Sequence, residues 1–250
     1  MVRGRTVEIF MIDRESTGRW RCTLSNWDGV AYKIPRNMLN KCSDRNDMNR
    51  SGLYFLLGMD PDKNTSAVYV GESDDTLNRL ERHNSSKSKS SKDDWWGECI
   101  AFIGKDDSMN KAHVRYLEYR AICLAKDSGR YELINSIIPN PPSLSESDLS
   151  VIEEFLENVR LIVGVLGHNF MDPITSEREK DTPDDPMYYI KRERSAILAR
   201  GKIVNEGFVI LAGSTVSSSF NEKSTYKKLN DINKKLDKII KNQEKQHGKK

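Results

Sequence analysis

The stretch that decides the fold is residues 52–71, which read GLYFLLGMDPDKNTSAVYVG. Both ends of this stretch consist of β-forming residues bounded by glycines, a pattern typical of strands. Residues 60–64 between them are rich in turn formers, so the two strands are expected to pair as an antiparallel hairpin. That pairing would set Tyr54 and Tyr69 side by side.

A short helix is predicted directly after this hairpin. Residues 73–76 offer an N-cap with acids in the first turn, and Leu77 and Leu80 have the apolar spacing of a helix. Arg79 and His83 then lie four residues apart on one helix face. Taken alone, an arginine and a histidine on a polar helix face are ordinary solvated residues.

A longer helix is predicted at about residues 110–126, and it carries an acid on its apolar face. The apolar stripe consists of Val114, Leu117, Ala121, Ile122, Leu124 and Ala125. Glu118 lies inside that stripe. Because a carboxylate on a buried face needs a partner, Glu118 is either a structural acid held by an ion pair or hydrogen bond, or a metal ligand or catalytic acid or base.

Six positions, taken in order, resemble the motifs of the GIY-YIG nuclease family. They are Gly52-Leu53-Tyr54, Tyr69-Val70-Gly71, Arg79, His83, Glu118 and Asn135. Residues 110–118 further resemble a bacterial subgroup in which a short N-terminal segment precedes the nuclease domain. The combination is specific for the family and says little about the substrate.

The resemblance implies an α+β fold with a small three-stranded antiparallel sheet flanked by helices. It also implies a metal-dependent endonuclease that hydrolyses DNA phosphodiester bonds. Glu118 would hold Mg²⁺ or Mn²⁺, and the metal would polarise the phosphate and stabilise the leaving oxygen. Arg79 would neutralise the charge that builds on the scissile phosphate. Asn135 would orient the site, because an amide has no useful proton affinity.

A tyrosine would then accept the proton of the attacking water. An unperturbed phenol has a pKa near 10, which is about three units above neutrality, or roughly 4 kcal/mol against the phenolate. Arg79, the metal and His83 are the groups that could lower it. Either Tyr54 or Tyr69 could serve; we favour Tyr69, although the sequence does not decide. Some family members carry a lysine after the second motif, where this chain has Glu72, which leaves His83 as the better helper.

A second class of function stays open, namely a nucleic-acid-binding or scaffold protein that kept the fold and lost turnover. The intact Arg79 and Glu118 favour the enzyme, since an uncompensated carboxylate on an apolar helix face destabilises a protein that has no use for it. DNA is preferred over RNA only by analogy with the family. Defence against foreign DNA and DNA processing are both compatible roles.

Composition agrees with a protein of one or two domains. The chain has 250 residues, 37% of them hydrophobic. The longest apolar stretch, residues 161–166, is too short to span a membrane, and no signal peptide is recognisable. The four cysteines, at positions 22, 42, 99 and 123, have no zinc or disulfide spacing. A reducing, cytoplasmic location is expected.

Charge is distributed unevenly along the chain. Residues 226–250 contain nine lysines and three acids, a net of +6, so the preceding residues carry a net of −3 within the total of +3. Nucleic-acid binding would therefore depend on local clusters around Arg79. The candidates are Arg82, Lys87, Lys89 and Lys92, three of them in a Ser- and Lys-rich loop at residues 84–94 that is expected to be mobile.

The sequence predicts five segments. They are a β-rich segment at 1–50, the nuclease domain with its packing helix at 51–170, a linker at 171–190, a partial β-rich domain at 191–220 and a basic helical tail at 221–250. Residues 199–214 resemble the opening of an uncharacterised β-rich domain. Apolar residues three and four apart make the tail amphipathic. It could mediate self-association, dock on the chain's own domain, attach to nucleic acid or acidic lipid, or stay solvated.

Overall fold

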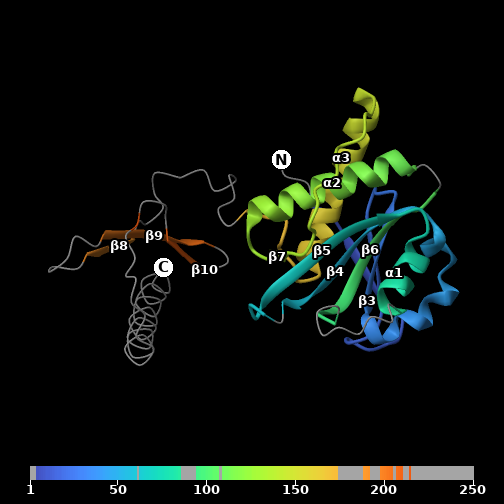
Figure 1. The fold of residues 1–250 in the computed structure, drawn as a ribbon, viewed down its shortest axis with the longest axis horizontal. Helices are drawn as coiled ribbons and strands as arrows, with labels where there is room; N and C mark the ends of the chain where they lie inside the picture. Colours follow the sequence, from blue (N-terminus) through green and yellow to red (C-terminus); the bar gives the residue numbers. More distant parts are fainter. Residues whose placement is uncertain are drawn as a thin grey trace, which may run out of the picture. The chain divides into compact units, whose positions relative to one another are not determined.

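The computed structural model describes residues 4–60, 62–85, 94–106, 109–173, 188–191, 198–204, 207–210 and 214. The chain divides into two compact units, Met1–Ser176 and Glu177–Lys250. The first unit is of the α+β class and holds every candidate site residue that the structure describes (Figure 1). Three of the predicted nucleic-acid contacts, Lys87, Lys89 and Lys92, lie outside the described residues, as does the tail at 221–250.

The hairpin predicted from residues 52–71 is confirmed. Strands β4 (Gly52–Asp60) and β5 (Thr65–Ser73) pair antiparallel along their whole length, with Tyr54 opposite Gly71. Strand β6 (Trp96–Gly104) pairs antiparallel with the other edge of β4. These three strands form the centre of the sheet.

The sheet has seven strands, so the small three-stranded sheet that was expected is wrong in size. The order is β1-β2-β3-β6-β4-β5-β7. The added strands are β1 (Val7–Met11), β2 (Trp20–Leu24), β3 (Gly29–Pro35) and β7 (Glu132–Leu133). All seven residues of β3 pair with β6, so the N-terminal β segment continues the central sheet. The physical reason is that β3 is apolar toward both faces of the sheet and would be exposed elsewhere.

Helices cover both faces of this sheet. They are η1 (Arg36–Asp44) and η2 (Asn46–Asn49), both of the 3-10 type, and the α-helices α1 (Thr76–Ser85), α2 (Lys111–Ser128) and α3 (Glu146–Val165). None of the described helices combines the length and hydrophobicity that a membrane crossing requires.

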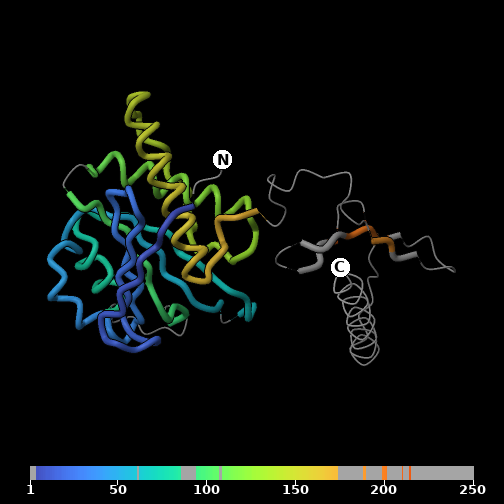
Figure 2. Tube along the Cα trace, turned by 180° about the vertical axis from the view of Figure 1, so that it is seen from behind, coloured from blue at the N-terminus to red at the C-terminus, as the bar shows by residue number. Residues whose placement is uncertain are grey.

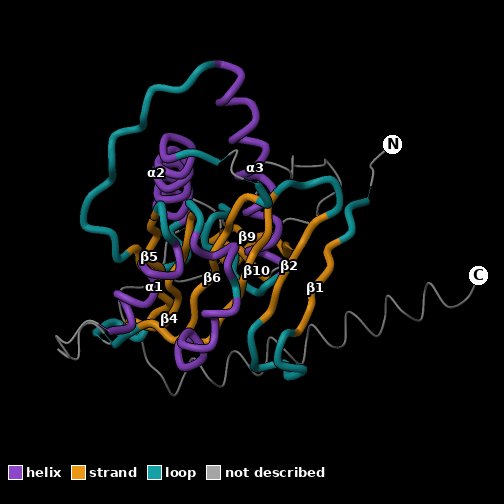
Figure 3. Tube along the Cα trace, turned by 90° about the vertical axis from the view of Figure 1, so that its right-hand side faces the viewer, coloured by secondary structure: helices purple, strands orange, loops and turns teal. Residues whose placement is uncertain are grey.

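Alternation along β4 divides the core into two clusters. Leu53 and Phe55 face α2 and α3, whereas Tyr54 and Leu56 face α1 and the two 3-10 helices. Figure 3 shows the strands between these two sets of helices, and Figure 2 shows the course of the chain from behind. The outer edge of β5 pairs with β7 at Ala67 and Val68, and no other strand of the described residues pairs with this edge.

The ends of α2 and α3 follow from their capping residues. The side chain of Asn110 accepts a hydrogen bond from the backbone N–H of His113, and Gly129 ends α2 in the left-handed conformation. The Ser145 hydroxyl accepts from the backbone N–H of Asp148 at the start of α3. The start of α2 lies where the sequence predicted it.

The described part of the second unit contains a separate antiparallel sheet. Its order is β10-β9-β8, formed by β8 (Tyr188–Lys191), β9 (Leu198–Val204) and β10 (Gly207–Ile210). β9 and β10 lie within residues 191–220, where a partial β-rich domain is expected from the sequence, whereas β8 begins inside the predicted linker at 171–190.

Gly71 leaves room in the core for the side chain of Tyr54. A Cβ at this position would overlap the hydroxyl and ring of Tyr54, whereas a Cβ at Gly97, in the same sheet, would meet nothing. We expect Gly71→Ala to destabilise the first unit by about 1–3 kcal/mol, the usual cost of overpacking. Gly97→Ala should change its free energy of unfolding by less than about 0.5 kcal/mol.

The measurement is urea unfolding followed by tryptophan fluorescence, because all four tryptophans lie in the first unit. Equal effects of the two substitutions would contradict the contact between Gly71 and Tyr54.

Candidate active site

Tyr54 lies at the centre of the cluster that the sequence motifs predict. Its side chain is 0% exposed and packs on the α1 face of β4. Its hydroxyl oxygen lies 3.2 Å from Arg79 Nε and 3.0 Å from His83 Nε2. Because α1 places Arg79 and His83 one turn apart, both reach the same phenol.

Tyr69 lies beside Tyr54 on the same face of the hairpin and is half-buried. The centroids of the two tyrosine rings are 6.3 Å apart. The His83 ring meets both of them edge-on, at centroid distances of 5.6 Å from Tyr54 and 5.5 Å from Tyr69. The structure therefore brings four of the six predicted residues into one cluster.

The hydrogen-bond directions in this cluster follow from what each group can donate. Arg79 has no acceptor, so the Tyr54 oxygen accepts from it and the phenol proton is free for His83 Nε2. Burial, together with the charges of Arg79 and Arg82, lowers the pKa of His83 to about 4. His83 is therefore neutral at physiological pH and can accept that proton. Burial, reinforced by Tyr69, raises the pKa of Tyr54, which keeps it protonated.

Arg79 stays charged beside both phenols. Its hydrogen bond with Tyr54 is the main cause of a raised pKa, and Tyr69 adds to the effect. The bond through Nε also fixes the plane of the guanidinium, whose remaining donors suit the oxygens of a phosphate.

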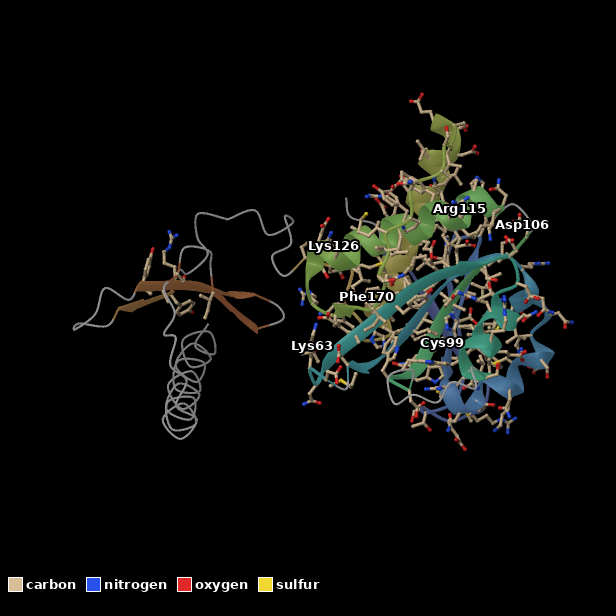
Figure 4. All side chains as sticks on the ribbon, viewed as in Figure 1. Lys63, Cys99, Asp106, Arg115, Lys126 and Phe170 are labelled. Atoms are coloured by element: carbon tan, nitrogen blue, oxygen red, sulfur yellow. The ribbon has the colours of Figure 1, made fainter. Side chains whose placement is uncertain are left out.

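Glu118 lies half-buried in the middle of α2. Burial, and then repulsion from the carboxylate of Glu72, raise its pKa to about 7 against the opposing charges of Arg115, Lys111 and Arg79. Arg115 is on the same helix, three residues earlier (Figure 4). Within the described part of the chain, Glu118 has no hydrogen bond or ion pair. The ion pair or hydrogen bond that would make Glu118 a structural acid is therefore not found among the described residues.

Lys111, which the sequence did not single out, connects the two halves of the site. Its Nζ lies 2.9 Å from Glu72 and 3.1 Å from Asp74. Lys111 opens α2, and Glu72 belongs to β5, so these ion pairs join the helix that carries Glu118 to the strand that carries Tyr69. No local pattern could have revealed this contact, because 39 residues separate Lys111 from Glu72.

Asn135 lies beside the backbone of β5. Its side-chain oxygen accepts from Val70 N at 2.9 Å, and its amide donates to Val70 O at 2.8 Å. Just before it, Ile134 N donates to Val68 O at 2.9 Å. The amide thus adds one more rung after β7 and fixes the backbone between Tyr69 and Gly71 without entering the cluster of phenols.

The residues present fit a hard divalent cation bound through one protein ligand. No group of three or more His, Cys, Asp or Glu suited to a metal occurs among the residues that the structure describes. Mg²⁺, however, commonly takes one or two carboxylates and completes its shell with waters and substrate phosphates. Glu118, whose charge is destabilised and unpaired in the described structure, has the chemistry of such a ligand.

Comparison of the chain with protein-family models, curated proteins and solved structures found no match. The resemblance to the GIY-YIG motifs therefore depends on the residues and on their arrangement.

The raised pKa of Glu118 predicts how its replacement changes stability. The ordinary pKa of a glutamate side chain is 4.5, and Glu118 titrates at about 7 in the folded chain. Between these pH values the folded state binds more protons, so stability falls as pH rises and the loss is complete above pH 7. Without divalent metal, Glu118→Gln should raise the Tm at pH 8 by a few degrees, at about 2–4 °C for each kcal/mol.

Below pH 4.5 the same substitution should leave the Tm unchanged. Glu157→Gln, at an exposed position of α3, is the control and should have no effect at either pH. A fall in Tm for Glu118→Gln at pH 8 would mean that the carboxylate has a stabilising partner.

Proposed function

We propose that this chain is a metal-dependent endonuclease of the GIY-YIG type that hydrolyses phosphodiester bonds in DNA. The observation that carries the proposal is the pairing of two features. One is the cluster of Tyr54, Tyr69, Arg79 and His83; the other is Glu118, a destabilised carboxylate without a partner in the described structure. The two features influence each other: the charge of Arg79 lowers the pKa of Glu118, and the charge of Glu118 raises the pKa of Tyr54.

The arrangement of strands supports the same reading. The three central strands β6-β4-β5 are antiparallel, as the resemblance implies, and α1 follows β5 directly. The additional strands extend these three central strands on both sides and do not separate Tyr54 on β4 from Tyr69 on β5.

In the proposed mechanism, Glu118 would hold Mg²⁺ or Mn²⁺. When bound, the metal would polarise the phosphate and stabilise the leaving oxygen. Arg79, fixed through Tyr54, would hold the non-bridging oxygens and offset the charge that develops on them. Lys111 would keep α2, which carries Glu118, in a fixed position relative to β5, which carries Tyr69, and Asn135 would fix the backbone of β5.

We assign the role of general base to Tyr69, acting as its phenolate after its own proton has gone to solvent, because Tyr69 is the accessible phenol of the pair. Tyr69 is half-buried, whereas Tyr54 is 0% exposed and its hydroxyl is engaged by Arg79 and His83. A base must meet the attacking water, directly or through one other water. Tyr54 and His83 are then positioning residues that hold Arg79 and the ring of Tyr69.

The test of the proposed function is cleavage of single-stranded and duplex DNA with Mg²⁺, Mn²⁺ or chelator, read on a gel. The wild type should cleave only with metal, and Glu118→Gln should lose about 10²-fold or more of the rate, the usual cost of removing a principal charge-stabilising group. Glu157→Gln is the matched control, because it makes the same chemical change at an exposed site.

Cleavage by Glu118→Gln at the wild-type rate would remove the metal assignment. Absence of cleavage by every variant, with DNA binding retained, would instead indicate the inactive nucleic-acid-binding protein on the same fold.

The two tyrosines are separated by comparing Tyr69→Phe with Tyr54→Phe. Loss of a general base typically costs about 10²- to 10⁴-fold, so Tyr69→Phe should fall in that range with little change in KM. Tyr54→Phe should retain more activity and lose stability, since it leaves His83 and Arg79 without their buried partner. The opposite order of activities would assign the base to Tyr54.

A further inference from the structure

The two flanks of helix α2 contact different parts of the first unit. On one flank, Tyr116 Oη and Arg120 Nε each lie 2.6 Å from the same carboxylate oxygen of Glu153 on α3. On the other flank, Lys111 forms an ion pair with Glu72 of β5. One flank of α2 therefore faces α3, and the other faces the end of β5 beside the candidate active site.

Arg115 lies on the flank that faces β5 (Figure 4). At about 100° per residue, Lys111, Arg115 and Glu118 fall within about 60° of one another around the helix axis, and the residues that contact α3 fall on the other side. Arg115 precedes Glu118 by three residues, a rise of about 4.5 Å along the axis. Of the three positive charges that lower the pKa of Glu118, that of Arg115 has the largest effect, ahead of Lys111 and Arg79.

The guanidinium of Arg115 has no bonding partner in the described structure. Arg115 is exposed and makes no hydrogen bond or ion pair with any other described residue. It does not pair with Glu118, although side chains three residues apart on a helix are neighbours. The other two cations that act on Glu118 are already bonded, since Lys111 holds two carboxylates and Arg79 holds a phenol. Arg115 therefore keeps all its donors for a ligand.

We propose that Arg115 binds a backbone phosphate of the nucleic-acid substrate, one or two nucleotides away from the scissile phosphate. The inference rests on the proposed nuclease function and adds a substrate-binding residue to it. The planar fork of a guanidinium matches two oxygens of one phosphate. Successive phosphates of a duplex strand are about 3.4 Å apart along the axis, which is comparable with the rise of about 4.5 Å from Glu118 to Arg115.

This position of Arg115 selects a polymeric substrate. An ester with a single phosphate would meet Arg79 and the metal at Glu118, and would leave Arg115 without a ligand. A strand with consecutive phosphates supplies a second anion for Arg115. The expected substrate class is therefore a polynucleotide, and Arg115 contributes to its binding without taking part in the chemical step.

The phosphate contacts along α2 should end at Arg115. Lys111, one turn earlier, lies 2.9 Å from Glu72 and 3.1 Å from Asp74. One positive and two negative side chains leave this cluster with a net charge of −1, which repels a phosphate. Lys111 thus joins α2 to β5, and Arg115 is the cation of this flank that meets the substrate.

The first test measures how the full chain binds a fluorescent DNA duplex, by anisotropy over a range of salt concentrations and with chelator present so that no cleavage occurs. Arg115→Gln should weaken binding about tenfold, the effect of losing one charge-assisted hydrogen bond. It should also reduce the slope of log K against log salt by about 1. Arg115→Lys should keep the slope, because it retains the charge, and should recover part of the affinity.

Arg14→Gln is the matched control for this measurement. It makes the same chemical change at an exposed arginine between β1 and β2, at the end of the sheet opposite β5. The affinity and the salt slope should be those of the wild type. An equal loss of affinity in Arg14→Gln and Arg115→Gln would overturn the proposal, because it would indicate attraction by the overall charge.

The second test separates binding from chemistry by steady-state cleavage with Mg²⁺ or Mn²⁺. Arg115→Gln should raise KM for the duplex about tenfold and change kcat less than twofold, as expected when an interaction is the same in the ground state and the transition state. Hydrolysis of bis(p-nitrophenyl) phosphate, which has a single phosphate, should be the same in Arg115→Gln and the wild type. A fall in kcat with unchanged KM would overturn the proposal.

The two tests distinguish failure of this inference from failure of the proposed function. A wild type that cleaves DNA, with Arg115→Gln binding and cleaving equally well, would remove the phosphate contact and leave the nuclease in place. A wild type that never cleaves DNA, but binds it in a manner that depends on Arg115, would remove the nuclease and leave the phosphate contact. A wild type that does not bind DNA at all would contradict both.

Discussion

The burial of the Tyr54 hydroxyl is the constraint on which the rest of the site depends. A phenol that is 0% exposed must have its polar atom satisfied, and the groups that satisfy it are Arg79 and His83. Gly71 opposite leaves room for the ring because a side chain there would overlap it. The same contacts fix a permanently charged guanidinium and a neutral imidazole beside Tyr69. A requirement of packing and a requirement of the proposed chemistry are thus met by one set of contacts.

The position of β5 near one end of the seven-stranded sheet allows charged side chains from helices on opposite faces to approach the same strand. α1 and α2 lie on opposite faces, and β5 is the strand beside which both present charged side chains. Asn135 fixes the backbone of β5 through hydrogen bonds to Val70. The ion pair of Lys111 with Glu72 joins the start of α2 to the C-terminal end of β5. Glu118 is held in this frame without a partner in the described structure, which is unfavourable for stability and suits a site that gains its counter-charge from a bound cation.

Local features of the fold were predictable, and non-local ones were not. The β4-β5 hairpin and the caps at Asn110 and Ser145 follow from turn residues and capping residues near in sequence. The pairing of β3 with β6 joins segments about 70 residues apart in sequence, and nothing in either strand specifies the partner. In the site, four of the six motif residues form one cluster, but the difference in exposure between Tyr54 and Tyr69 depends on how α1 covers the sheet. The ion pair of Lys111 with Glu72 could not be predicted either, because it joins residues that are far apart in sequence.

The most direct test of the central claim is anomalous diffraction from crystals of the full chain grown with Mn²⁺ and a DNA oligonucleotide. A manganese peak is expected within about 2.1 Å of a Glu118 carboxylate oxygen, the oxygen distance of a small divalent cation. A phosphate of the DNA should lie between that metal and Arg79. A manganese ion bound elsewhere beside the DNA, with none at Glu118, would contradict the account.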